Sequence, residues 1–182
     1  MEIKTTQSVR RNTISSPELL NDGSDDQFRD FITQLFAVSS RLQTMRRSVG
    51  RAMSLNASQF SILLAVWHLQ KGKGVGIQEI GKYLHIAPAH ITAEVGQLVE
   101  KNLLDKKSDP RDNRAVCIST TDRSDELLDQ HSEYLCAIND QLFAGMTREQ
   151  FQIVFDFLNR FILQSDLALV LAERGENTAD SE

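Results

Sequence analysis

The fold of this chain is decided by residues 78–121, which read QEIGKYLHIAPAHITAEVGQLVEKNLLDKKSDPRDNRAVCISTT. Ile80 and Leu84 are four residues apart, and this spacing predicts a short helix over 78–84 with one apolar face. Residues 85–86 then form a turn before the helical periodicity resumes. The pattern therefore predicts two helices joined by a tight turn.

The second helix is predicted over 87–101. Pro88 stands at its first position, where a missing backbone N–H removes no hydrogen bond, and Asn102 is expected to end it in the left-handed conformation. The apolar residues that define its buried face are Ile91, Val95 and Leu98. The opposite face carries small or hydrogen-bonding residues: Ala89, His90, Thr92, Ala93, Gly96 and Gln97. Such a face would let the helix enter the major groove of DNA closely.

Two extended segments, 103–107 and 115–120, follow the second helix and predict a two-stranded wing. The polar loop between them, 108–114, places Arg111 and Arg114 near the tip. Guanidinium groups at this position suit phosphates or a narrow minor groove. We therefore expect DNA contacts from these residues: Pro88, Ala89, His90, Thr92, Ala93, Gln97, Arg111 and Arg114.

This order of elements resembles the MarR (multiple antibiotic resistance regulator) family of winged-helix transcription regulators. The most specific part of the resemblance runs from Ile91 through VEKNLL (99–104) and DPRDNR (109–114) to IST (118–120). The chain departs from the family pattern at Ala93, where many relatives carry Arg, and at Asn102, where they carry Gly. The resemblance implies a DNA-binding regulator whose terminal helices interlock two subunits.

We expect a mainly α chain with a small β-wing, in which a winged helix-turn-helix is flanked by long N- and C-terminal dimerisation helices. The expected divisions are a flexible N-terminal tail (1–23), an N-terminal dimerisation helix (24–55), a winged-helix DNA-binding domain (56–121), C-terminal dimerisation helices (122–173) and a flexible tail (174–182).

Capping boxes mark three helix starts, at Ser24 with Gln27, Asn56 with Gln59 and Thr147 with Gln150. The first helix repeats apolar residues every seven positions: Phe28, Leu35, Leu42 and Val49. The second is expected to bury Phe60, Leu63, Leu64 and Trp67. One long helix is predicted through Leu127, His131, Leu135, Ile138 and Leu142. The last helix has a wide apolar stripe formed by Phe151, Val154, Phe155, Leu158, Phe161 and Ile162.

Apolar stripes at both ends of a chain of 182 residues need something to cover them. A two-fold homodimer would cover them, and it would set two recognition helices about one DNA turn apart, suited to a palindrome. The alternative is that both stripes pack within one monomer.

The charge distribution along the chain supports a DNA-facing middle segment. The formal net charge is −5, yet residues 31–121 hold 12 Lys and Arg against 6 Asp and Glu. Residues 122–182 hold 4 basic and 13 acidic residues. Such asymmetry would steer DNA to one part of the molecule, although charged residues are often no more than solvated surface.

The sequence contains no run of about eighteen apolar residues and no apolar signal-peptide core at its N-terminus. We therefore expect a cytoplasmic protein without a membrane segment. Cys117 and Cys136 lack metal-type spacing, and no structural disulfide is needed. Either thiol could serve as an oxidation sensor, but an inert thiol is favoured. The four histidines share no ligand pattern, so neither a metal nor a cofactor is expected.

Arg46, Trp67 and His68 are candidates for an effector pocket between the dimerisation helices and the winged helix. A cation, an aromatic ring and an imidazole would suit an anionic aromatic ligand. The competing interpretation places Trp67 in the core.

The sequence thus predicts a ligand-responsive regulator that binds a palindromic operator in double-stranded DNA as a homodimer. We expect a repressor that a small aromatic or acidic effector releases. The alternatives are a thiol-based redox-sensing regulator and a winged helix used for protein contacts. An enzyme is disfavoured because the chain has no phosphate loop, nucleophile arrangement or metal motif.

Overall fold

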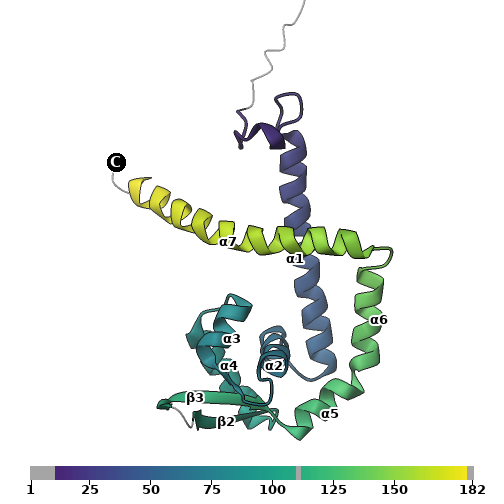
Figure 1. The fold of residues 1–182 in the computed structure, drawn as a ribbon, viewed down its shortest axis with the longest axis vertical. Coiled ribbons are helices and arrows are strands. Elements are labelled where there is room, and N and C mark those ends of the chain that lie inside the picture. The colour runs from purple at the N-terminus through teal and green to yellow at the C-terminus, as the bar shows by residue number, and fades with distance from the viewer. Residues whose placement is uncertain (1–10, 110–111, 180–182) are drawn as a thin grey trace, which may run out of the picture. The chain divides into compact units, whose positions relative to one another are not determined.

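The computed structural model describes residues 11–109 and 112–179, with the backbone alone for 109, 112–115 and 175–179 (Figure 1). The chain divides into two compact units that meet in sequence between His131 and Ser132. The first unit contains η1 (Pro17–Leu19), α1 (Asp26–Ala52), α2 (Ala57–Leu69), β1 (Val75–Gly76), α3 (Ile77–Leu84), α4 (Pro88–Glu100), β2 (Leu104–Asp109), β3 (Asp112–Thr120) and α5 (Asp122–Gln130). The second contains α6 (Ser132–Leu142) and α7 (Arg148–Ala179).

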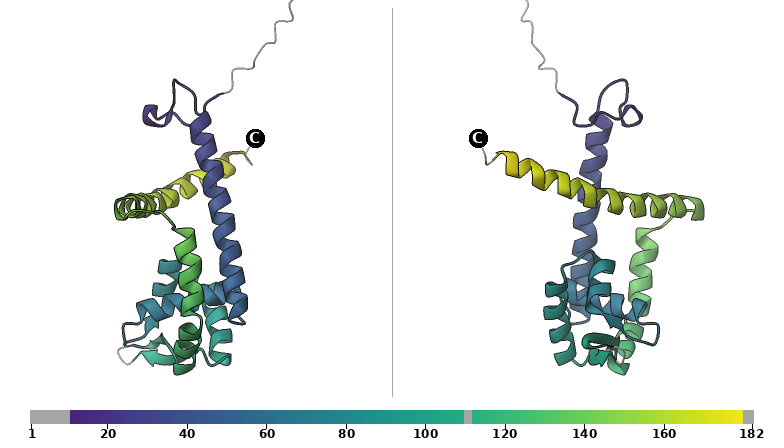
Figure 2. Two further views of the ribbon diagram at one scale, coloured as in Figure 1. Left: turned by 90° about the vertical axis from the view of Figure 1, so that its right-hand side faces the viewer. Right: turned by 60° about the vertical axis from the view of Figure 1, so that its left-hand side comes forward.

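Helix α2 forms the centre of the first unit. It contacts α1, α3, α4 and β3, and Figure 2 shows α2, α3 and α4 gathered against the sheet. Ile62, Leu63 and Val66 have no exposed surface. The Asn56 side chain accepts from Gln59 N–H at 2.8 Å, and Gln59 accepts in return from Asn56 N–H. The predicted capping box at this helix is confirmed.

The sheet is antiparallel, with strand order β1-β3-β2. Its central strand, β3, pairs Ile118 with Val75 on one side and with Lys106 on the other. The predicted hairpin of the wing is confirmed, and both strands extend further toward the loop than the sequence predicted. The two-residue strand β1 was not predicted because so short a segment carries no periodicity.

Residues 11–25 precede α1, which begins at Asp26. Residues 11–25 form an ordered hook, in which Thr13 donates to the Asp25 carboxylate through both its N–H and its hydroxyl. Arg29 Nε donates to the same carboxylate at 2.9 Å. The partners of Asp25 are therefore Thr13, which precedes it in the chain, and Arg29, one helical turn after it. The predicted Ser24–Gln27 capping box does not form. Residues 1–10 of the expected tail lie outside the described residues.

Of the helix predictions after the wing, one is wrong and another is confirmed. The helix predicted through 127–142 is broken at His131, whose Nδ1 lies 2.9 Å from the carbonyl oxygen of Leu127. The predicted Thr147–Gln150 box that starts α7 is confirmed by both hydrogen bonds. Helix α7 then continues to Ala179, so helical backbone occupies most of the expected C-terminal tail, 174–182.

Trp67 is not in the core, contrary to the prediction, because 54% of its surface is exposed. The apolar residues of the terminal helices are exposed as well: on α1 these include Phe31, Phe36, Val38 and Leu42, and on α7 Phe151, Ile153, Leu163, Leu167 and Leu171. A single chain thus leaves large apolar surfaces uncovered. No helix in the described ranges is apolar enough over a sufficient length to cross a membrane.

Gly81 is required where α3 turns toward α4. Its carbonyl accepts from Ile86 N–H at 3.0 Å, and a Cβ at this position would lie 2.9 Å from the carbonyl oxygen of Ile86. Gly81→Ala is therefore expected to lower the free energy of unfolding by about 1–3 kcal/mol. Urea denaturation measures this change as a lower midpoint at an unchanged slope.

Gly96 provides the matched control, because a Cβ there would meet no atom within 4 Å. Gly96→Ala lies within α4 and should raise stability by roughly 0.5–1 kcal/mol. Equal effects of the two substitutions would contradict the tight approach at Gly81.

The N-terminal hook gives a prediction about pH. Hydrogen bonds from Thr13, together with Arg29, lower the pKa of Asp25 to about 2. Because the pKa is lower in the folded chain, the contribution of Asp25 is present above its ordinary pKa and is lost as pH falls through about 2. Hydrogen exchange over residues 11–25 should remain slow at pH 5 and become fast in Asp25→Asn.

Asp26→Asn is the matched control for the hook, since Asp26 is exposed in the first turn of α1. It should leave hydrogen exchange over residues 11–25 unchanged. Protection that survives in Asp25→Asn would show that this carboxylate does not hold the hook.

Candidate nucleic-acid interface

Helix α4 has one buried and one exposed face, as the sequence predicted. At most 1% of the surface of each residue on the buried face is exposed, and these residues are Ile91, Val95 and Leu98. The predicted DNA-facing residues are all exposed: Pro88, Ala89, His90, Thr92, Ala93, Gly96 and Gln97. The interior side of α4 is therefore fixed by packing, while its other side is free to meet a partner.

The ends of α4 have the geometry that the local sequence predicts. His85 ends α3 in the left-handed conformation, and Pro88 occupies the first turn of α4. Asn102 has a φ of 57°, and its N–H donates to the carbonyl of Val99 while Leu103 N–H donates to that of Leu98. This pair of bonds is a Schellman motif, so the predicted left-handed Asn102 is confirmed.

The polar side chains of the exposed face are already hydrogen-bonded within the chain. His90 Nε2 lies 2.9 Å from Ser58 Oγ, and Gln97 Oε1 accepts from Gln59 Nε2 at 2.8 Å. Thr92 Oγ1 donates to the Pro88 carbonyl of its own helix at 2.9 Å. The first turn of α2 therefore belongs to the same surface as α4.

The contribution of α2 was missed from the sequence, although its capping box placed polar residues in the first turn. Asn56 Nδ2 donates to Glu94 Oε2 at 3.3 Å, and Glu94 Oε1 lies 4.0 Å from His90 Nε2. Glu94 is the acidic residue of α4 closest to the DNA-facing set. Its carboxylate would repel nearby phosphates, which restricts how α4 can approach a duplex.

The wing presents cations beside this surface. Lys106 and Lys107 on β2 are exposed, and Lys107 Nζ lies 3.2 Å from Asp105 Oδ2. Arg111 lies outside the described residues, and Arg114 belongs to β3, where only its backbone is described.

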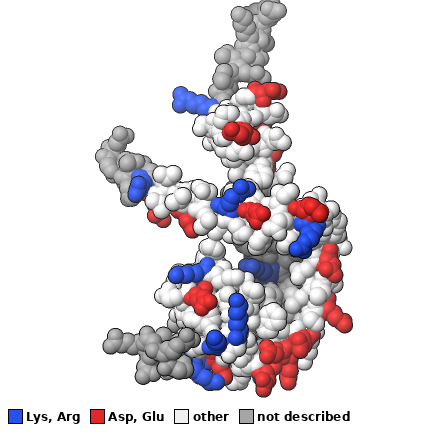
Figure 3. All heavy atoms as spheres, viewed as in Figure 1, with Lys and Arg blue, Asp and Glu red and all other residues white. Residues whose placement is uncertain are grey.

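Charge is separated within the first unit. Helix α5 carries acidic residues along its length, and Figure 3 shows them gathered over that helix: Asp122, Asp125, Glu126 and Asp129. Lys and Arg are more frequent in the segment before α5, as the sequence count indicated. A polyanion would therefore be attracted to the helix-turn-helix and wing and repelled from α5.

The three predicted effector residues do not line the cavity described below. Arg46 is exposed on α1, Trp67 is exposed on α2, and His68 stacks on Tyr83 with ring centroids 5.6 Å apart. Trp67 and His68 adjoin each other in sequence, and the His68–Tyr83 stack joins α2 to α3. Their role in ligand binding stays a prediction.

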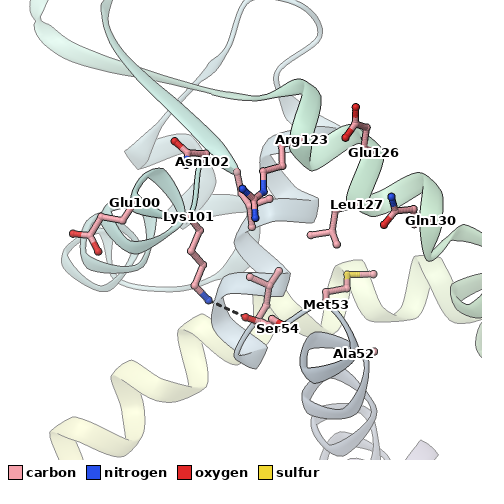
Figure 4. Close-up of a pocket in the computed structure, with 12 residues that line it drawn as sticks. Ala52, Met53, Ser54, Glu100, Lys101, Asn102, Arg123, Glu126, Leu127 and Gln130 are labelled. Atoms are coloured by element: carbon pink, nitrogen blue, oxygen red, sulfur yellow. Dashed lines mark hydrogen bonds between the residues drawn. The ribbon is translucent and has the colours of Figure 1, made fainter.

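A cavity of about 700 Å³ lies elsewhere in the first unit (Figure 4). It is lined by residues 52–55 between α1 and α2, by residues 100–103 at the end of α4, and by Arg123, Glu126, Leu127 and Gln130 of α5. No sequence signal identified it, because these segments meet only through the tertiary fold. Its volume is in the range of small-molecule sites.

Lys101 connects this cavity to the DNA-facing surface. Its Nζ donates to the Ser54 carbonyl at 2.9 Å and to Gln59 Oε1 at 3.0 Å. The amide nitrogen of Gln59 donates to Gln97 on α4. The buried amide of Gln59 thus lies between Lys101, which lines the cavity, and Gln97, which belongs to the exposed face of α4.

The cysteines have different environments. Cys117 is half-buried in β3, and its Sγ donates to the Lys73 carbonyl at 3.0 Å, whereas Cys136 is exposed on α6. Across the described ranges, no cluster of three or more His, Cys, Asp or Glu side chains could hold a metal ion.

Two helices joined by a tight turn, an exposed polar face on the second helix and a β-hairpin beside it define a winged helix-turn-helix DNA-binding domain. Residues 45–131 match the family model for the transcriptional regulator SarA/Rot. The chain is 28% identical to the HTH-type transcriptional regulator MhqR of Bacillus subtilis over 134 residues, which cover 70% of this chain and 88% of that protein.

Solved structures show the same fold. CouR from Rhodococcus jostii, bound to p-coumaroyl-CoA, aligns with a TM-score of 0.67 at 20% identity, covering 76% of this chain and 95% of that one. PcaV from Streptomyces coelicolor, in complex with its natural ligand, aligns with a TM-score of 0.55 at 21% identity, covering 69% of this chain and 89% of that one. These matches support a winged-helix transcription regulator of the MarR type.

Proposed function

We propose that this protein is a repressor that binds a palindromic operator as a homodimer and leaves the DNA when a small aromatic or acidic effector binds. The observation that carries the DNA-binding part is the division of α4 into a packed face and an exposed, groove-compatible face. A regulator of this kind acts where the DNA is, so we place it in the cytoplasm.

The homodimer is supported by the apolar surfaces of the terminal helices. Phe36 on α1 is 72% exposed, and Ile153 and Leu171 on α7 are 69% and 68% exposed. Leaving such residues in water is unfavourable, and a second copy of the chain offers an equivalent apolar surface to cover them. A two-fold pair of α4 helices would read two half-sites of a palindrome.

The effector is supported by what similar proteins hold in their structures. CouR is bound to p-coumaroyl-CoA, and PcaV, whose alignment covers 69% of this chain and 89% of that one, is in complex with its natural ligand. An aromatic or acidic effector would have two candidate locations in this chain: the region of Arg46, Trp67 and His68, and the cavity beside Lys101.

The test of base reading uses the exposed face of α4. We expect His90→Ala and Gln97→Ala to weaken binding to a duplex selected from a random pool by about 1–3 kcal/mol for each lost base contact. Binding to a random duplex should change little, because phosphate contacts dominate it. Fluorescence anisotropy with both duplexes measures the two affinities.

Gln43→Ala, on the exposed surface of α1, is the control for amide removal and should leave both affinities unchanged. Because His90 and Gln97 hold Ser58 and Gln59, thermal unfolding of each variant separates lost base contacts from a loosened α2. An equal loss of affinity for the selected and random duplexes would rule out base reading by these residues.

The wing gives a separate prediction about salt. Arg111→Ala or Arg114→Ala should weaken binding to every duplex and reduce the dependence of log K on log salt by about one unit, as expected when one phosphate contact is lost. The measurement is a salt titration of duplex binding, with light scattering to verify that the dimer is intact. Wild-type slopes in both variants would exclude the wing from the interface.

A further inference from the structure

The cavity beside Lys101 has cationic and apolar parts. Arg123 reaches into it from α5, and Met53 and Leu127 face its interior (Figure 4). Two carboxylates belong to lining residues, Glu100 and Glu126, but Figure 4 shows both directed away from the interior. The interior is therefore suited to an anion with an apolar body.

The apolar part of the cavity is well formed. Met53, Leu55 and Leu103 have 3–4% of their surface exposed, so they are fixed by packing. Arg123 is exposed, and no carboxylate among the side chains that the structure describes forms an ion pair with it. A ligand carboxylate would therefore meet a guanidinium that is available for a bidentate pair.

Lys101 is the second cation of the cavity, and it is held by two neutral acceptors. These are the Ser54 carbonyl at 2.9 Å and Gln59 Oε1 at 3.0 Å. A carboxylate is a stronger acceptor for an ammonium group than a neutral amide oxygen is. A bound carboxylate would thus compete with Gln59 for Lys101.

Gln59 transmits the consequence to α4. Only 3% of its surface is exposed, and its Nε2 donates to Gln97 Oε1 at 2.8 Å. If Lys101 turns toward a ligand, Gln59 Oε1 loses its charged donor and keeps only the longer bond from Asn56 N–H at 3.4 Å, which favours rotation of the buried amide. Rotation would break or reverse the bond to Gln97 on the DNA-facing surface.

We propose that this cavity binds a small carboxylate with an apolar body between Arg123 and Lys101, and that Lys101, Gln59 and Gln97 couple its occupancy to DNA binding. The inference rests on the proposed function and assigns its effector response to a site and a route. A duplex that requires the unliganded arrangement of Gln97 lowers the affinity of the protein for the carboxylate. By linkage, the carboxylate lowers the affinity for that duplex by the same factor.

The binding experiment uses the full chain with benzoate, 3-phenylpropionate and hexanoate, and uses benzamide as the uncharged counterpart of benzoate. Isothermal titration should show binding of at least one carboxylate and none of benzamide. Arg123→Gln should weaken that binding roughly tenfold or more, and Leu127→Trp, which fills the cavity, should abolish it. Arg51→Gln, an exposed arginine near the end of α1, should bind as the wild type does.

The location is tested against the other candidate region in the same titration. Loss of carboxylate binding in Arg46→Gln or Trp67→Ala, with wild-type binding in Arg123→Gln and Leu127→Trp, would overturn the assignment to the cavity. Binding of none of the three carboxylates would overturn it as well.

The coupling experiment measures affinity for the selected duplex with and without saturating carboxylate. The wild type should lose affinity roughly 5- to 150-fold, the range typical of coupling between sites. Lys101→Met should show reduced duplex affinity without any ligand, whereas Gln97→Ala should still bind the carboxylate and lose most of the response. An undiminished response in Gln97→Ala would overturn the route through Gln59.

Failure of the inference and failure of the proposed function give different results. A chain that binds a selected duplex in a salt-dependent manner but shows no Arg123-dependent carboxylate site would retain the proposed function and overturn the inference. A chain that binds carboxylate through Arg123 but binds no duplex would overturn the proposed function and the coupling, while supporting the cavity as a ligand site.

Discussion

The burial of α2 is the constraint on which the rest of the first unit depends. This helix contacts α1, α3, α4 and β3, and Ile62, Leu63 and Val66 have no exposed surface. Each fully buried aliphatic side chain contributes roughly 1.5–3 kcal/mol of transfer free energy, so the neighbours of α2 are held at fixed positions around it. The exposed face of α4 has a defined direction because Ile91, Val95 and Leu98 are packed on the other side.

The first turn of α2 adds a polar connection to this apolar core. Asn56, Ser58 and Gln59 contact Glu94, His90 and Gln97 of α4, respectively. The surface that meets DNA in our proposal is therefore made by two helices. Because Gln59 also completes the capping box of α2, the start of that helix and the presentation of Gln97 depend on one side chain.

Sequence alone predicted the features that local residues determine. Asn102 adopts the left-handed conformation, and the box at Asn56 forms, because each requires only neighbours within a few residues. The Ser24 box failed because Thr13, 12 residues before Asp25, supplies the competing hydrogen bonds. The exposure of Trp67 and the existence of the cavity depend on which elements meet in space, and periodicity does not encode that.

Arg123 illustrates how a position can be unfavourable locally and useful in the tertiary structure. It lies in the first turn of α5, between Asp122 and Asp125, where the helix dipole favours acidic residues over a cation. Helix stability therefore does not explain an arginine here. The side chain instead reaches into the cavity at the end of α4, and the acidic residues of α5 keep the charge of that helix negative around it (Figures 3 and 4). A cation in this setting would attract a single small anion while the surface of α5 still repels the DNA backbone.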